Sequence, residues 1–130
     1  MPASLPVIVV DDQAPFRSAA KAVLRRMEGF ELIGEAVDGS EAVAMVSELR
    51  PALVLMDINM PGMSGIEATR RIVADDPEVV VVLLSTYSPG DVPPDAVTSG
   101  ARAYLNKEDF SPAVLQRLWD ERDNGGFQLR

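Results

Sequence analysis

The sequence of 130 residues contains neither cysteine nor histidine. Without cysteine, the chain can form no disulfide, thiol nucleophile or cysteine-ligated zinc site. Without histidine, it can carry no Ser-His-Asp triad, no HExxH metal site and no phosphohistidine. Its chemistry must therefore come from carboxylates, amines and hydroxyls, together with any hard metal ion that their oxygens bind.

Basic residues and long apolar runs are also scarce. The 12 Lys and Arg residues are outnumbered by 20 Asp and Glu residues, which gives a formal net charge of −8. Phosphate backbones repel such a chain, so we expect no direct nucleic-acid binding. No window approaches the roughly 18 apolar residues of a membrane-spanning helix, and residues 1–10 lack the basic start of a secretory signal. The sequence therefore predicts a soluble, cytoplasmic protein without a membrane partner.

Short apolar runs alternate along the chain with segments of helical periodicity. The runs lie at residues 5–10, 32–33, 53–56, 79–84 and 103–105. Apolar side chains recur every three or four residues within 16–27, 42–49, 66–73 and 114–119. The three longest runs are continuous, as in strands buried on both faces of a parallel sheet. This order predicts a single α/β domain with helices on both faces of the sheet.

Acidic residues follow two of the continuous runs. Asp11 and Asp12 come after the first run, and Asp57 comes after the run at 53–56. Ligands of parallel sheets bind outside the carboxyl ends of the strands, so these carboxylates would meet at one rim if the two strands are neighbours. Three carboxylates repel one another unless a cation binds, and oxygen ligands favour Mg²⁺. The alternative is that each acid only begins a loop or caps a helix.

Lys107 and Ser85 lie at the ends of the last two apolar runs and could reach the same rim. Mg²⁺, an ammonium and a hydroxyl around an ionised aspartate would hold a phosphoryl group by its three oxygens. Taken singly, Lys107 is more simply a solvated lysine and Ser85 a hydroxyl at a strand end. The combination favours phosphoryl chemistry.

Several segments together resemble the receiver domains of two-component response regulators. They are Asp11-Asp12, residues 57–65 (DINMPGMSG), Ser85-Thr86 and residues 100–107 (GARAYLNK), in matching order and spacing. The resemblance implies a flavodoxin-like (βα)5 three-layer sandwich with a parallel sheet of strand order 2-1-3-4-5. A single receiver domain would then occupy residues 1–130, with its core at 5–122 and a C-terminal tail at 123–130.

The resemblance also implies the roles of the acidic residues. Asp57 would be the phosphoacceptor. Mg²⁺ would bind to Asp11, Asp12, Asp57 and the backbone carbonyl of Asn59. Because the chain has no histidine, a sensor histidine kinase or a phosphotransfer protein would supply the phosphoryl group. The domain would catalyse the transfer to its own Asp57, as a self-phosphorylating and self-dephosphorylating switch rather than a turnover enzyme.

Further residues would form the switch that the resemblance implies. Ser85 and Lys107 would hold the phosphoryl group, and Tyr104 would rotate inward when Ser85 engages it. Thr86 is larger than the Ala or Gly usual at its position and Tyr87 also flanks the site, so we expect narrowed access and slow self-dephosphorylation. The output would be a downstream protein target or an output domain in a longer product, with a phosphorylation-dependent homodimer as a further expectation.

Two segments depart from the family pattern. Glu108 occupies a position where many receivers have a proline. The region before Gly100 contains Pro89, Pro93 and Pro94, and a proline inside a helix costs about 3 kcal/mol. The fourth helix can therefore begin only near Pro93 or Pro94, so we expect it to be short or mobile and the usual output face to be altered.

Two other functions are alternatives at this point. A receiver-like interaction module that works without phosphorylation would fit the shortened fourth helix. A phosphohydrolase with an aspartate nucleophile would share Mg²⁺, Asp57 and Lys107. However, Asn59 stands where such an enzyme needs a second aspartate as its general acid.

Overall fold

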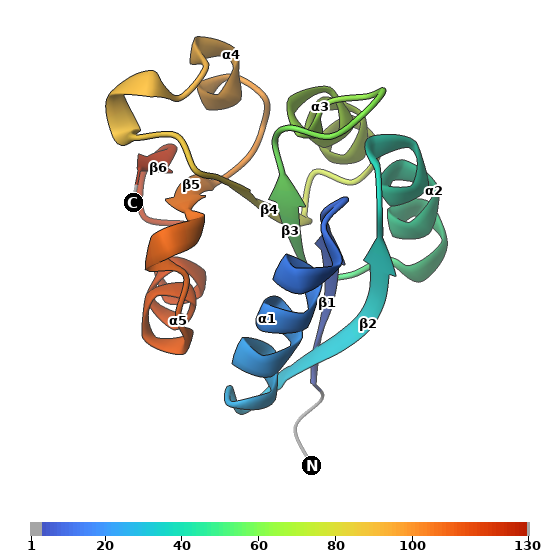
Figure 1. The fold of residues 1–130 in the computed structure, drawn as a ribbon, viewed down its shortest axis with the longest axis vertical. Helices are drawn as coiled ribbons and strands as arrows, with labels where there is room; N and C mark the ends of the chain where they lie inside the picture. Colours follow the sequence, from blue (N-terminus) through green and yellow to red (C-terminus); the bar gives the residue numbers. More distant parts are fainter. Residues whose placement is uncertain (1–3, 130) are drawn as a thin grey trace.

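The computed structural model describes residues 4–129; residues 1–3 and Arg130 of the predicted domain lie outside that range. One parallel sheet has the strand order β2-β1-β3-β4-β5-β6 (Figure 1). Its strands are β1 (Leu5–Val10), β2 (Phe30–Ala36), β3 (Leu53–Asp57), β4 (Val80–Ser85), β5 (Ala103–Asn106) and β6 (Gln128–Leu129). The predicted flavodoxin-like order 2-1-3-4-5 is confirmed.

Five α-helices connect the strands and cover both faces of the sheet. They are α1 (Ala14–Arg25), α2 (Gly39–Leu49), α3 (Gly65–Asp75), α4 (Pro94–Val97) and α5 (Pro112–Asp120). Alternate residues of β1 divide the core: Val7 and Val9 belong to a cluster with α1 and α5, whereas Ile8 and Val10 belong to a cluster with α2, α3 and α4. Because β3 and β4 contribute to both clusters, all of their residues are buried. This explains their continuous apolar sequences.

The fourth helix is short, as predicted. A 3₁₀ turn at Pro89–Asp91 precedes α4, which contains four residues and begins at Pro94. Proline is tolerated at the first position of a helix because it has no N–H to donate, but it cannot occupy the interior. The prolines therefore leave a single turn of α-helix between β4 and β5.

The C-terminal segment contains a strand that the sequence did not predict. Gln128–Leu129 forms β6 and pairs in parallel with Ala103 and Tyr104 of β5. Gly125 has a φ of +92°, a left-handed conformation that suits glycine in a turn between α5 and β6. Two residues are too few to show a strand period, so the predicted tail at 123–130 carried no signal for β6.

No helix within residues 4–129 combines the length and the apolar character needed to cross a bilayer.

Candidate functional site

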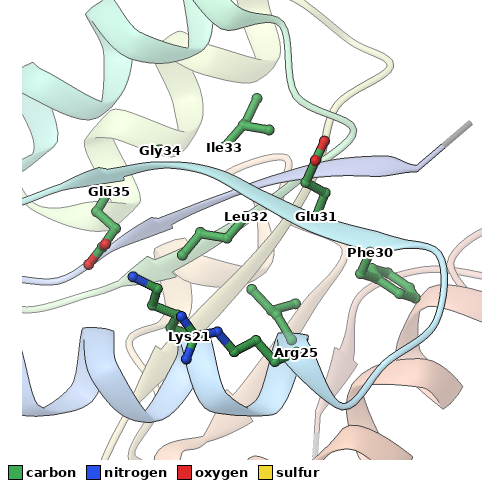
Figure 2. Close-up of a pocket in the computed structure, with 9 residues that line it drawn as sticks. Lys21, Arg25, Phe30, Glu31, Leu32, Ile33, Gly34 and Glu35 are labelled. Carbon is green, nitrogen blue, oxygen red and sulfur yellow. The ribbon is translucent and has the colours of Figure 1, made fainter.

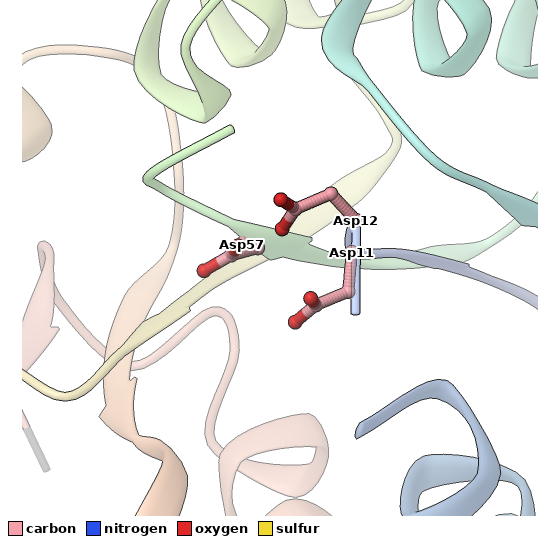
Figure 3. A group of neighbouring side chains, drawn as sticks. All are labelled: Asp11, Asp12 and Asp57. Carbon is pink, nitrogen blue, oxygen red and sulfur yellow. The ribbon is translucent and has the colours of Figure 1, made fainter. Parts of the chain in front are cut away.

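The three predicted acidic residues meet at the carboxyl end of the sheet (Figure 3). Asp11 directly follows β1 and Asp57 ends β3, and these two strands are hydrogen-bonded neighbours. One carboxylate oxygen from each of Asp11, Asp12 and Asp57 lies within 4.8 Å of the others. Asp11 is 0% exposed and Asp57 is 4% exposed, whereas Asp12 is open to solvent. Two buried anions and one exposed anion therefore share a single small volume.

Lys107 joins this acidic cluster from the end of β5. Its Nζ lies 2.7 Å from Oδ2 of Asp11 and 3.3 Å from Oδ1 of Asp57. The ammonium also lies 4.6 Å from the centroid of the Phe16 ring on α1, close enough for a cation–π interaction. The structure thus places the predicted lysine between the two buried carboxylates.

Burial and charge shift the pKa values of the two central groups. Burial raises the pKa of Asp57 from 3.8 to about 6; the charge of Asp11 adds to the increase, and Lys107 opposes it. Burial alone would lower the pKa of Lys107. The hydrogen bond to Asp11 and the charges of Asp57 and Asp11 outweigh that effect, and the pKa of Lys107 is raised. At neutral pH the site therefore contains an ionised Asp57 beside a charged lysine.

The last residue of β4 supplies the predicted hydroxyl. Ser85 ends β4 and is 4% exposed, and its Oγ accepts a hydrogen bond from Asn59 Nδ2 at 3.4 Å. The Asn59 carboxamide also contacts the Tyr87 hydroxyl, with Nδ2 at 3.2 Å and Oδ1 at 3.3 Å. Thr86 is exposed. Asn59 thus links the loop after β3 to the loop after β4 beside the carboxylates.

The predicted switch residue Tyr104 lies inside the protein. Its side chain is 0% exposed, and its hydroxyl donates to the backbone carbonyl of Tyr87 at 2.8 Å. Burial raises the pKa of Tyr104 to about 12, so the hydroxyl keeps its proton and can donate. The Tyr104 ring is thus in the inward position in this structure.

Two contacts of the site were not anticipated from the sequence. Arg17 of α1 donates to the backbone carbonyl of Asp11 at 2.8 Å. Asn106 Nδ2 donates to the Tyr87 carbonyl at 3.1 Å. An amide directly before Lys107 at a strand end was the available signal for Asn106, whereas nothing in the sequence indicated a partner for Arg17.

A hollow of the surface lies away from this site. It has a volume of about 420 Å³ and lies between α1 and β2, and Lys21, Arg25, Glu31 and Glu35 contribute to its lining (Figure 2). None of the predicted site residues lines it. The candidate site is therefore the shallow rim at the ends of β1, β3, β4 and β5.

Comparisons with known proteins agree with this geometry. The family model of the response regulator receiver domain matches residues 7–118. The chain is 34% identical over 121 residues to the transcriptional regulatory protein DegU of Brevibacillus brevis, covering 93% of this chain and 51% of DegU. It is 36% identical over 112 residues to the chemotaxis protein CheY of Thermotoga maritima, covering 86% of this chain and 92% of CheY.

A solved structure shows the same fold. The crystal structure of the CheX-CheY-BeF3-Mg²⁺ complex from Borrelia burgdorferi contains a chain that matches with a TM-score of 0.80 and 29% identity, over 91% of this chain and 89% of that one. The present chain spans about half the length of DegU and of several other curated relatives. A matching family model, matching relatives and a matching fold lead to one conclusion: the chain belongs to the response regulator receiver domains, the phosphoryl-accepting domains of two-component signalling.

Proposed function

We propose that Asp57 is the phosphoacceptor and that a partner phosphohistidine is the donor, on a sensor histidine kinase or a phosphotransfer protein. A carboxylate oxygen of Asp57 attacks phosphorus, and the P–N bond breaks. The electron pair of that bond stays on the imidazole nitrogen. The observation that carries the proposal is the position of Lys107, 2.7 Å from Asp11 Oδ2 and 3.3 Å from Asp57 Oδ1. An ammonium there stabilises negative charge on the oxygens that transfer brings to the rim.

The acidic cluster fits a bound Mg²⁺ ion. In this proposal Asp11, Asp12, Asp57 and the backbone carbonyl of Asn59 hold the ion. The donor set is suitable because carboxylate oxygens of all three acids lie within 4.8 Å of one another, and hard oxygen ligands select Mg²⁺. When bound, the ion supplies positive charge that offsets the carboxylates and the phosphoryl oxygens. The CheX-CheY complex from Borrelia burgdorferi contains Mg²⁺ together with BeF3.

Ser85 and Tyr104 carry the signal in this proposal. Phosphorylation replaces one negative charge by about two and adds three acceptor oxygens. Ser85, which now accepts from Asn59 Nδ2, can turn its hydroxyl toward those oxygens, while Lys107 holds them from the other side. The inward position of Tyr104 is the arrangement that phosphorylation favours.

We further propose that loss of the phosphoryl group is slow. Asn59 and Tyr87 are bonded to each other beside Ser85, and Thr86 follows it. Together these side chains obstruct a water molecule that approaches phosphorus opposite the Asp57 oxygen. Tyr87→Ala removes the ring and is expected to accelerate dephosphorylation several-fold. The decay of the phosphoprotein after removal of the donor measures this; a wild-type half-life of seconds would contradict the proposal.

The partners follow from the same proposal. Because the chain spans about half of DegU, the output is either an attached domain in a longer product or a separate protein target. A homodimer that forms on phosphorylation and a cytoplasmic location complete the proposal. The net charge of −8 argues against direct binding of nucleic acid by this segment.

One other function has a specific observation in its favour. Tyr104 is fully buried and its hydroxyl is bonded to the Tyr87 carbonyl, and α4 has only four residues. Both features fit an interaction module whose binding surface is fixed. Such a module would show the same partner affinity with and without a phosphodonor, whereas the proposed switch would not.

The central experiment is phosphorylation of the 130-residue chain by acetyl phosphate and Mg²⁺, followed by mass spectrometry. We expect one phosphoryl group per wild-type chain and none on Asp57→Asn. The matched control is Asp75→Asn, which changes an exposed carboxylate at the end of α3 and should leave phosphorylation intact. Phosphoryl uptake by Asp57→Asn, or none by the wild type, would refute Asp57 as the acceptor.

A further inference from the structure

Two side chains of β5 hold one carbonyl group of the loop after β4. The Tyr87 carbonyl accepts from the Tyr104 hydroxyl at 2.8 Å and from Asn106 Nδ2 at 3.1 Å. A carbonyl oxygen has two lone pairs, so these two donors use its full accepting capacity. Tyr87 lies two residues after Ser85, and Asn106 immediately precedes Lys107. The doubly bonded carbonyl therefore joins the segments that carry the two proposed phosphoryl-holding residues.

The orientation of the Asn106 carboxamide is determined by both of its contacts. Its Oδ1 accepts from the backbone N–H of Glu108 at 2.9 Å, which caps the 3₁₀ turn at Lys107–Asp109. Its Nδ2 donates to the Tyr87 carbonyl. Rotating the carboxamide by half a turn would place its Oδ1 against the Tyr87 carbonyl oxygen and its Nδ2 against the Glu108 N–H, and both hydrogen bonds would be lost. Asn106 is also the register partner of Ser85 in the sheet, so it begins close to the loop that it holds.

We infer that Asn106 is a positioning residue that keeps the loop after β4 attached to β5, with Tyr104 inward. The inference rests on the proposed function, because its consequence is a fixed placement of Ser85 relative to Lys107. Asn106 itself contacts the Tyr87 carbonyl and the Glu108 N–H rather than the acidic cluster. Its effect on phosphoryl binding is therefore exerted through the loop.

Losing the Asn106 bond to the Tyr87 carbonyl should lower the population of the inward Tyr104 ring rather than remove the site. With only the Tyr104 hydroxyl on the Tyr87 carbonyl, the loop would leave β5 more often and the inward ring would be less populated. A ligand that needs the inward arrangement then binds more weakly in proportion to that population. The loss of one net hydrogen bond changes the equilibrium between the attached and the detached loop by about fivefold, which sets the upper limit of the loss in affinity.

Two substitutions separate this role from simple capping. Asn106→Asp keeps an acceptor for the Glu108 N–H, and aspartate caps helical turns well, but it removes the donor to Tyr87 and places a carboxylate there. Asn106→Leu removes both bonds without adding charge. If Asn106 only caps the turn, Asn106→Asp should behave like the wild type and Asn106→Leu should not. If added negative charge alone causes the effect, Asn106→Asp should show it and Asn106→Leu should not.

Ring-¹³C tyrosine NMR provides a readout that does not require phosphorylation. The chain has two tyrosines, and the variant Tyr87→Phe, which keeps the backbone carbonyl, assigns their signals. In the absence of Mg²⁺ we expect both Asn106 variants to shift or broaden the Tyr104 ring signals toward those of an exposed ring. The second readout is the beryllium fluoride concentration, at fixed Mg²⁺, that half-saturates the Tyr104 shift. It should rise in Asn106→Leu, by up to about fivefold, and at least as much in Asn106→Asp as in Asn106→Leu.

The outcomes separate clearly. Tyr104 signals displaced in both variants, with weaker beryllium fluoride binding in both, would support the inference. A wild-type spectrum or wild-type half-saturation in either variant would overturn it. If the wild type itself fails to bind beryllium fluoride, the proposed function fails. Displaced Tyr104 signals in the two variants would still show that Asn106 holds the loop.

Discussion

The two halves of the functional rim are built differently. The half formed by β1, β3 and α3 carries the buried acids Asp11 and Asp57, and its 11-residue helix is capped by the Ser64 side chain. The half formed by β4, α4 and β5 carries Ser85 and Tyr104, and its helix has four residues. Packed backbone holds the groups that must stay fixed. Ser85 and Tyr104, which the proposed switch moves, instead flank the segment between β4 and β5, whose helical turns are short.

The largest expected contrast is between two glycines. A methyl group at Gly65, the first residue of α3, would overlap the backbone carbonyl of Asp57. A methyl group at Gly90, in the 3₁₀ turn before α4, would meet no described atom within 4 Å. We therefore expect Gly65→Ala to lower the free energy of unfolding by about 3 kcal/mol or more, and Gly90→Ala to change it by less than about 0.5 kcal/mol.

Urea denaturation of both variants measures this contrast. Gly65→Ala should also reduce phosphorylation by acetyl phosphate, since the overlap lies at the phosphoacceptor's own backbone. Equal stability of the two variants would show that the half around α3 is no more tightly packed than the half around α4.

The next largest effect concerns the buried charge of Asp57, in the half formed by β1, β3 and α3. The pKa of Asp57 is raised from 3.8 to about 6, chiefly by burial. Above pH 6 the Asp57 carboxyl is ionised in the folded and in the unfolded chain. Because ionisation is less favourable in the folded chain, it lowers the free energy of unfolding by up to about 3 kcal/mol. This cost falls as the pH drops from 6 toward 3.8, because the folded state takes up its proton first. Without metal at pH 7, Asp57→Asn should therefore raise the free energy of unfolding by roughly 2 to 3 kcal/mol.

Denaturation with EDTA at several pH values checks the sign of this effect. The advantage of Asp57→Asn should shrink between pH 6 and pH 4, and Mg²⁺ should stabilise the wild type more than the variant, since Mg²⁺ relieves the same repulsion. An advantage that is constant with pH would argue that the gain comes from something other than the buried charge. Lys107 stays paired with Asp11 in the variant, so its own charge remains compensated.

The smallest effect compares two serines that precede helical turns. The Ser64 hydroxyl accepts from the backbone N–H of Glu67 at the start of α3. Ser88 holds the equivalent place before the 3₁₀ turn at Pro89–Asp91, and among the described contacts it makes no side-chain capping bond. Ser64→Ala should cost about 1 kcal/mol and Ser88→Ala close to none. Thermal unfolding followed by circular dichroism can resolve the difference; a larger loss at Ser88 would reverse the contrast between the two halves.

Much of the fold and the position of the acids follow from local patterns. The continuous apolar runs of β1 and β3 indicated strands buried on both faces, and the acids at their ends had to meet once those strands were neighbours. Prolines fixed the length of α4, because a proline cannot occupy a helix interior. The strand β6 could not be predicted, since its pairing depends on the exposed edge of β5 and its two residues carry no period.

The sequence by itself determined which groups stand at each strand end: Asp11, Asp57, Ser85 and Lys107 occupy those positions by spacing alone. Only the tertiary structure decided how they are partnered. Lys107 lies nearer to Asp11 than to Asp57, Asn106 shares a carbonyl with Tyr104, and the Tyr104 ring is buried. These contacts join residues 17 to 96 positions apart. Their distances are set by how strands and loops pack, which hydrophobic period and turn chemistry do not specify.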